Sequence, residues 1–509
     1  MGKVKKYFPL VLLEVYLGGI YLLYRCGIWF YPYRKDWLTA LFILGCMTAM
    51  GLGYVLCAKK MKVVEGIRQG SQRRWSIILI ASSALLLIPC CYGRTGEIYP
   101  HLIEAFGDLA QAYAKASEAV FNTGIAHYFS AFATFFFYLL YIDLFFFWKD
   151  MKNYRWFGVA EIVWYVAVEM STGHNKGIIF FALITVIIFV CSMMNNGTKR
   201  EKLFRTLIMI FVTLVGVSYF TISVRDRNRS SIASLEASGM SIKEMELEAA
   251  GEMIIDEYGY EEPLIVEKEE NNEERFNEYK VQVILGQYDI SIVNRYEEAA
   301  KTLLEINPKY IDEYSYSFVN SDDAIYKMMP SMLRDVYVMG NYYLTHGFHS
   351  LALALRLPFE SSFGFSTHYY FEKSASKLLS VDFYKRSYVY KVNQAGYPVS
   401  TKWGTAYLQW ASDLSFPGVV LFMGILGAFI CRLWWDVQCK NDYLSIVVLT
   451  FMTVNLLFIS SWWQAGRSGT DFLMLYGPLI FWIVRELRDK WKRGLERKKA
   501  IGNIKNDDI

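Results

Sequence analysis

Runs of about twenty apolar residues recur along the chain, and each is long enough to cross the hydrocarbon core of a bilayer as one helix. The chain is also 54% hydrophobic, which is more than a soluble domain of this size needs. One short run, 157–170, carries Glu161 and Glu169 and is the least typical of a span. We predict ten spans, near residues 7–25, 37–57, 75–92, 127–148, 157–170, 178–194, 204–223, 415–433, 443–461 and 471–485.

The distribution of Lys and Arg predicts the orientation of the chain. If the N-terminal segment MGKVKK is cytoplasmic, the inner connections hold several times as many Lys and Arg as the short outer connections. Among the short connections this asymmetry follows the positive-inside rule without exception. Both termini are then cytoplasmic, and the turn STGHNKG (171–177) and the long stretch 224–414 face outward. We expect the first span to be a retained signal anchor, because no small-residue cleavage site follows it.

These features predict an all-α, multi-pass integral membrane protein. Its parts are seven spans within 1–223, an extracytoplasmic loop 224–414 with amphipathic or re-entrant helices, three spans within 415–485 and a basic cytoplasmic tail 486–509. Seven of the eight cysteines lie in spans or on the inner side, which suits the plasma membrane of a bacterium. The net charge of +4 comes from the inner connections, so no nucleic-acid partner is expected.

The outer loop begins with arginines that the topology does not explain. The sequence SVRDRNR (223–229) places Arg225 and Arg227 directly after a span on the outer side, against the positive-inside rule. The acidic stretch that follows, 236–278, is predicted to be a solvated, mobile segment without chemistry of its own. An amphipathic helix is predicted at 293–306, where it would pack on the rest of the loop.

A His-rich turn precedes a short apolar segment near the end of the outer loop. THGFH (345–349) places His346 and His349 on one helix face, but no third residue at a suitable spacing completes a metal site. A single His acting as a base or hydrogen-bond partner is expected instead, because imidazole titrates near neutral pH. LALALRLPF (351–359) is too short to span, so we expect an interfacial or re-entrant helix with Arg356 at headgroup level.

Several short motifs in the chain resemble those of one enzyme family. They are Tyr343-Leu-Thr-His-Gly347 with the following Leu351, Phe363-Gly364, Asp413-Leu-Ser-Phe-Pro417-Gly418 at the start of a span, STG at 171–173 and the arginines after the seventh span. Together they resemble the Wzy-type oligosaccharide repeat-unit polymerases, the O-antigen and capsule polymerases of bacteria. The chain departs from that pattern in Lys176, where the family more often has Arg, in the His-rich turn and in the acidic insertion.

The resemblance implies an enzyme that joins undecaprenyl-diphosphate-linked oligosaccharides at the outer face of the membrane, with no metal or cofactor. An acceptor hydroxyl attacks the anomeric carbon of the donor, and undecaprenyl diphosphate leaves. Cations must stabilise the negative charge on the departing diphosphate, and Arg suits this better than Lys because its planar guanidinium binds phosphate oxygens in bidentate fashion. A base removes the proton of the acceptor hydroxyl. Membrane lipid, a flippase and a chain-length regulator are the other partners that the resemblance implies.

The predicted topology assigns residues to these roles. We expect Arg225 and Arg467 to bind the diphosphate and His349 to accept the proton. His174 and Lys176 are expected to face the same outer cavity as Arg225 and Arg467. The full set of predicted substrate-binding residues is His174, Lys176, Arg227, Arg334, His346 and Arg356.

Other functions remain open at this point. A lipid-linked glycan ligase would use the same outer Arg and His and differ only in its acceptor. A flippase or transporter would show internal repeats and helices broken at the midplane, and the chain has no visible repeat. A polyprenol-sugar glycosyltransferase would carry an acidic pair in its first outer loop, where this chain has Asp36 alone.

Overall fold

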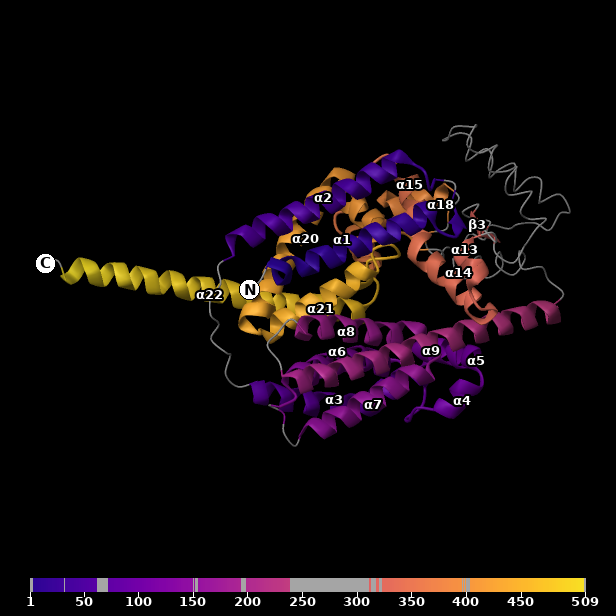
Figure 1. The fold of residues 1–509 in the computed structure, drawn as a ribbon, viewed down its shortest axis with the longest axis horizontal. Helices are drawn as coiled ribbons and strands as arrows, with labels where there is room; N and C mark the ends of the chain where they lie inside the picture. Colours follow the sequence, from indigo (N-terminus) through magenta and orange to yellow (C-terminus); the bar gives the residue numbers. More distant parts are fainter. Residues whose placement is uncertain are drawn as a thin grey trace.

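The computed structural model describes residues 3–31, 33–61, 72–149, 151, 154–193, 198–238, 311–312, 317–319, 323–395, 397, 399 and 403–507. Helices dominate these ranges, and the long ones run side by side (Figure 1). Among the described residues, seven helices are long and apolar enough to cross a membrane, and they match seven predicted spans. They are α1 (Lys3–Cys26), α2 (Trp37–Lys60), α3 (Gln72–Thr95), α6 (Ile125–Phe147), α8 (Asn175–Met193), α9 (Lys199–Ser238) and α20 (Ala406–Lys440).

The other three predicted spans are helical but shorter or more polar. They correspond to α7 (Arg155–Ser171), α21 (Tyr443–Leu457) and the first part of α22 (Gly469–Asp507). The two acids of α7 have partners on α3: Glu161 accepts a hydrogen bond from Ser83, and Glu169 forms an ion pair with Arg94 at 2.5 Å. The count of ten spans stays a prediction.

Two predicted boundaries differ from the helix ends. The seventh span was predicted to end at residue 223, but α9 is a single 40-residue helix that continues to Ser238. Helix α20 begins at Ala406, before the predicted start at 415, and it kinks at Ser415, whose φ of 65° is non-helical. The chain resumes its helix through Pro417, which is tolerated at the start of a helical segment. The membrane-length part of α20 therefore begins where the span was predicted.

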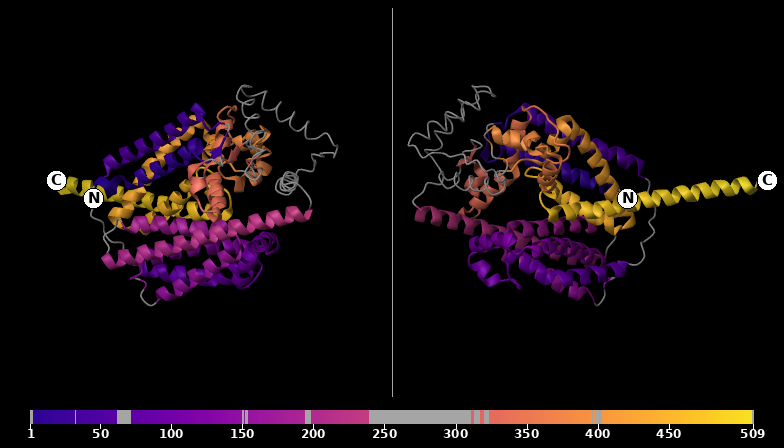
Figure 2. Two further views of the ribbon diagram at one scale, coloured as in Figure 1. Left: turned by 45° about the vertical axis from the view of Figure 1, so that its right-hand side comes forward. Right: turned by 180° about the vertical axis from the view of Figure 1, so that it is seen from behind.

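The shorter helices gather at one end of the bundle, which we call the loop end (residues 323–405 and 458–468). The N-terminus of α1 and the basic C-terminal part of α22 lie at the opposite, basic end (Figures 1 and 2). Helices α4 (Leu102–Gly107) and α5 (Leu109–Asn122), which were not predicted, follow α3 and precede α6 along the chain. The loop-end helices are α13 (Ala324–Met328), α14 (Ser331–Thr345), α15 (Gly347–Ala354), α16 (Tyr369–Leu379), α17 (Phe383–Arg386) and α18 (Tyr388–Gln394).

Helix α15 is enclosed by protein. All eight of its residues are buried, and Phe348 packs edge-on against Tyr21 of α1 at 5.6 Å. A helix lying on a lipid surface would keep an exposed polar face. The first four residues of the predicted segment 351–359 are therefore enclosed by protein, whereas 355–359 are half-buried or exposed, so the interfacial or re-entrant helix stays a prediction.

A small antiparallel sheet, absent from the all-α prediction, joins two distant segments. Strand β1 (Trp29–Phe30) follows α1, and it pairs with β3 (Ser317–Val319), which pairs in turn with β2 (Ile311–Asp312). Strands β2 and β3, from the stretch 224–414, are thereby tied to the connection between α1 and α2. The acidic stretch 236–278 and the predicted helix 293–306 fall outside the described residues, apart from the part of 236–278 that completes α9.

The burial pattern is that of a bundle in a membrane. A continuous hydrophobic core runs through the bundle, with large side chains such as Tyr165, Tyr407 and Trp434 fully buried. Large apolar side chains also cover the outside, including Leu85 and Phe211. Contiguous exposed apolar surface of this kind is rare on soluble monomers and normal where lipid is the solvent.

Candidate functional site

Asp413, just before the kink in α20, fixes the loop 361–368 at the loop end. Its carboxylate accepts five hydrogen bonds, and the bond from the Gly364 N–H is 2.9 Å long. Charge-assisted bonds of this kind are stronger than neutral ones. The Phe363-Gly364 motif and the Asp413 motif therefore form one structural unit. The donors are the backbone N–H groups of Gly364, Ser366 and Thr367 and the hydroxyls of Ser362 and Thr367.

The turn between α21 and α22 is held against the same loop. The buried Gln409 accepts a 2.7 Å hydrogen bond from the Trp463 N–H. Gly466 lies so close to the loop that an added Cβ would be 1.7 Å from the carbonyl oxygen of Thr367. Only glycine fits at position 466. The backbone of the next residue, Arg467, therefore starts from a point in contact with the loop.

A cavity of about 130 Å³ lies where these segments meet. Its walls come from α16, α17, α18, the connection before α20 and the turn before α22. Aromatic rings form much of the wall, and Glu372 and Arg467 supply charged groups of opposite sign. The lining residues are Ser366, Tyr369, Glu372, Phe383, Tyr384, Ser387, Val389, Trp403, Trp462 and Arg467.

Arg467 is the predicted diphosphate ligand that lines this cavity. Its side chain is exposed, and its guanidinium carbon lies 5.7 Å from the ring centre of Trp403. Within the described ranges Arg467 forms no ion pair, whereas Lys176 and Arg356 each do. Its charge is therefore available to an anion from outside the protein.

Lys176 and Arg356 are neutralised by carboxylates of the protein. Lys176 Nζ lies 2.7 Å from Asp471 Oδ2, and Arg356 Nη2 lies 2.7 Å from Asp36 Oδ1. Burial raises the pKa of Asp36, but hydrogen bonds from Arg356 and Thr39 outweigh this and hold that pKa below its ordinary value. Arg356 thus ties the segment after α15 to the connection between α1 and α2.

The remaining predicted arginines have different settings. Arg334 donates from Nε to the Met329 carbonyl at 3.1 Å and from Nη2 to the Lys327 carbonyl at 3.3 Å, so it fastens α13 to α14. Arg225 and Arg227 belong to α9, but their side chains lie outside the described residues. The expected substrate contacts of these three arginines stay predictions.

The histidines of the THGFH turn are buried among aromatic rings. His346 stacks on Tyr342 with ring centres 4.5 Å apart, and its ring centre lies 6.0 Å from Trp403, which lines the cavity. His349 is only 4% exposed, its ring centre lies 5.2 Å from that of Tyr397, and it does not line the cavity. Of the two, His346 is therefore the nearer to the cavity wall, while the base was predicted to be His349.

His174 and Lys176, both in the turn STGHNKG, contact different parts of the protein. The His174 ring packs 4.5 Å from the ring of Tyr113 in α5. Lys176 reaches Asp471, four residues beyond Arg467. Of the two residues expected to share a cavity with Arg467, only Lys176 is directed toward that turn.

Glu372 is a candidate functional residue that sequence reasoning missed. It lines the cavity from the first turn of α16, and it is 6% exposed. Burial raises the pKa of Glu372 and the charge of Asp382 raises it further, against a 3.1 Å hydrogen bond from Ser376. A carboxyl group shifted toward neutral pH is suited to proton transfer. The sequence FEKSASK around it is typical of a solvated helix and contains no signal of burial.

The described residues contain no group of three or more His, Cys, Asp or Glu that could hold a metal ion. Comparisons with protein-family models, with curated proteins and with solved structures found no match to this chain. The site must therefore be interpreted from its own chemistry.

That chemistry combines three elements in one small space. Arg467 supplies an available cation, Glu372 supplies a group that can gain or lose a proton, and Trp403 and Trp462 supply flat apolar faces. Aromatic faces pack on the apolar faces of sugar rings, while Arg binds phosphate oxygens in two-pronged fashion. The cavity can thus accommodate part of a ligand that carries both a sugar and an anionic group.

Proposed function

We propose that the chain is a membrane glycosyltransferase that polymerises undecaprenyl-diphosphate-linked oligosaccharide repeat units at the outer face of a bacterial plasma membrane. One observation carries the proposal: Arg467 and the buried Glu372 line the same aromatic cavity at the loop end. A chain with seven membrane-length helices in its described part can hold a lipid-linked substrate beside that cavity. The motifs shared with Wzy-type polymerases also support it.

The proposed reaction exchanges one bond for another. The acceptor hydroxyl oxygen bonds to the anomeric carbon of the donor sugar, and the bond from that carbon to the diphosphate oxygen breaks. Arg467, with Arg225 as the second predicted ligand, stabilises the negative charge that remains on undecaprenyl diphosphate. The hydroxyl proton passes to a base, for which Glu372 in the cavity and the predicted His349 are the two candidates.

The aromatic walls give the site its proposed selectivity for sugars. The Trp403 ring centre lies 5.7 Å from the Arg467 guanidinium carbon and 6.0 Å from the His346 ring centre. A sugar bound in the cavity against Trp403 would lie near the guanidinium of Arg467. Trp462 lines the same cavity and offers a second aromatic surface against which a sugar could pack.

The ligase is the second candidate, because an exposed Arg467 serves any lipid-diphosphate donor. It differs in transferring the glycan to another lipid instead of to a second repeat unit. A flippase, the third candidate, would form no covalent bond and would need no proton acceptor, so Glu372 favours an enzyme.

The experiment is a reconstitution of the purified chain in liposomes with a defined undecaprenyl-diphosphate-linked repeat unit. We expect a ladder of products and one released undecaprenyl diphosphate per bond formed, in the presence of a metal chelator. Arg467→Ala should suppress the ladder, while Arg488→Ala, an exposed arginine on α22 outside the cavity, should not. Transfer only after addition of a separate lipid acceptor would favour the ligase, and transport without bond formation would refute the enzyme.

A further inference from the structure

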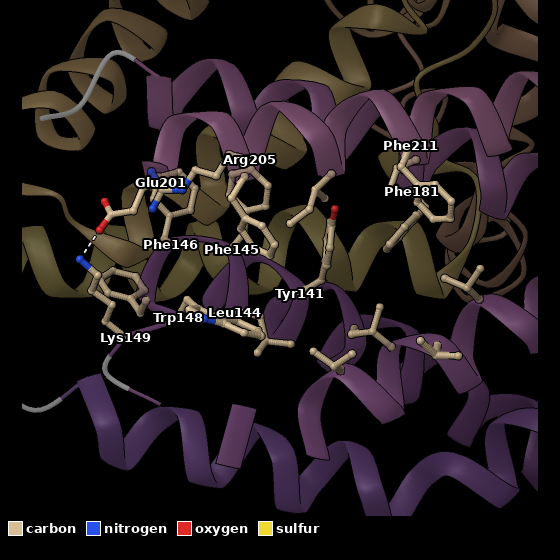
Figure 3. Close-up of a pocket in the computed structure, with 18 of the residues that line it drawn as sticks. Tyr141, Leu144, Phe145, Phe146, Trp148, Lys149, Phe181, Glu201, Arg205 and Phe211 are labelled. Carbon is tan, nitrogen blue, oxygen red and sulfur yellow. Dashed lines mark ion pairs between the residues drawn. The ribbon is translucent and has the colours of Figure 1, made fainter. Parts of the chain in front are cut away.

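A second cavity, of about 1400 Å³, lies between α6, α7, α8 and α9. It exceeds the roughly 300–1,000 Å³ of pockets for small molecules. Figure 3 shows rings of Tyr141, Phe181 and Phe211 along it and charged side chains gathered at one end. The space is thus long, apolar and polar at a single end.

The walls of this cavity belong to the membrane-crossing part of the bundle. Helices α6, α8 and α9 are among the membrane-length helices, and α7 closes the fourth side. Trp156 and Phe211, which line the cavity, are 62% and 67% exposed. Water in such a space would lose hydrogen bonds, whereas a hydrocarbon chain fills it at no such cost.

The charged end of the cavity carries more positive than negative groups. Lys149, Arg205 and Lys440 line it together with the single acid Glu201, which pairs with Lys149. Lys440 also pairs with Asp436 at 2.7 Å, and the Arg205 guanidinium lies 5.7 Å from the ring of Phe145. The Lys and Arg of this end complement a phosphate group, and basic pockets between membrane helices are typical headgroup sites.

We propose that this cavity binds an anionic phospholipid of the leaflet at the basic end. Its acyl chains lie between α7 and α9, and its phosphate lies beside Lys149 and Arg205. The occupant is distinct from the glycan-carrying lipid, because the candidate cavity with Arg467 lies at the opposite end of the bundle. The inference stands whether or not the chain is a glycosyltransferase.

The test uses the full chain in mild detergent, titrated with phosphatidylglycerol or with phosphatidylcholine of the same acyl chains and followed by native mass spectrometry. We expect phosphatidylglycerol to bind about tenfold more tightly or better. The double variant Lys149→Gln/Arg205→Gln should remove this preference, and Glu201→Gln should strengthen it, because it leaves the cations without their acid. Lys59→Gln/Lys60→Gln, exposed cations at the end of α2, should leave it unchanged.

A cavity-filling variant locates the binding. Val212→Trp should lower phosphatidylglycerol binding at an unchanged thermal midpoint, since Val212 lines the apolar part. If that variant does not fold, the charge variants decide alone. Equal affinity for the two phospholipids, unchanged binding in Lys149→Gln/Arg205→Gln, or displacement of phosphatidylglycerol by an equimolar undecaprenyl phosphate would overturn the proposal.

Discussion

Lys176 Nζ lies 2.7 Å from Asp471 Oδ2, and this ion pair joins the turn before α8 to the first turn of α22. Asp471 also accepts a 2.7 Å hydrogen bond from Ser468, the residue after Arg467. One carboxylate therefore links the turn before α8 to the turn before α22. We expect Lys176 to influence the candidate site by neutralising Asp471, which follows Arg467 by four residues.

Removing Lys176 should harm activity more than removing the whole ion pair. Lys176→Ala leaves the Asp471 charge uncompensated near the place where we expect a diphosphate. Lys176→Ala/Asp471→Asn removes that repulsion, so its turnover should recover, with a coupling free energy of about 0.5–3 kcal/mol between the two sites. The coupling free energy is measured from the steady-state turnover of four proteins: the unsubstituted chain, Lys176→Ala, Asp471→Asn and the double variant. Equal loss in the single and double variants would indicate that Lys176 contacts the substrate directly.

Arg467→Ala should lower turnover by about ten- to a hundredfold, because it removes a charge-assisted contact worth roughly 1.5–3 kcal/mol. Lys in its place should restore only part of the rate, since it lacks the planar fork. Arg225→Ala should behave similarly if the second predicted ligand is correct. The ladder assay at matched expression is the measurement. Normal product length and yield in Arg467→Ala would move the active site elsewhere.

The pH dependence of turnover should identify the base. If Glu372 accepts the proton, turnover rises with pH through a pKa above the ordinary carboxyl value of 4.5, because burial disfavours the charged form. Glu372→Gln should abolish that rise. The same raised pKa means that ionisation destabilises the fold, so Glu372→Gln should raise the thermal midpoint at neutral pH.

His349→Ala is the matched comparison for the base. If the predicted His349 takes the proton, His349→Ala lowers turnover more than it weakens binding of the lipid-linked substrate. The pH profile of turnover in Glu372→Gln then keeps the shape of the unsubstituted protein. Measuring kcat and KM for both variants across pH 4–9 separates the two groups. A large rise in KM alone for His349→Ala would mark a packing role beside Tyr397.

Asp413→Asn should loosen the loop 361–368. The carboxylate accepts hydrogen bonds from five donors, and an amide cannot accept all of them. We expect a loss of about 2 kcal/mol or more in the free energy of unfolding and faster amide exchange at Gly364 and Thr367. As a control, Asp382→Asn at the N-cap of α17 should change the free energy of unfolding little, because Asn caps a helix about as well as Asp. Unchanged exchange in Asp413→Asn would contradict this role.

The predicted orientation can be tested by cysteine labelling in a cysteine-free background. Single cysteines at 300 and 390 should react with a membrane-impermeant reagent in cells with a permeabilised outer layer. Cysteines at 70 and 495 should react only after the membrane is opened. The reverse pattern would invalidate both the orientation and the outward site.

Local sequence was sufficient for the membrane-length helices. Each depends on a run of neighbouring apolar residues, so α2 and α8 could be predicted without any tertiary contact. The boundaries of α9 and α20 were harder, because polar residues continue a helix beyond the apolar run when other parts of the protein support it. The kink at Ser415 next to Pro417 still coincided with the predicted start of a span.

Partnerships between distant residues were decided by the tertiary structure. The sequence indicated that Lys176, Arg356 and Arg467 are cations outside the spans, but all three look alike in sequence. Their difference comes from residues hundreds of positions away, since Asp471 neutralises Lys176 and Asp36 neutralises Arg356, while no described acid pairs with Arg467. Glu372 likewise became a candidate only when packing buried it, because the pKa of a carboxyl depends on its surroundings and its own neighbours along α16 give no sign of them.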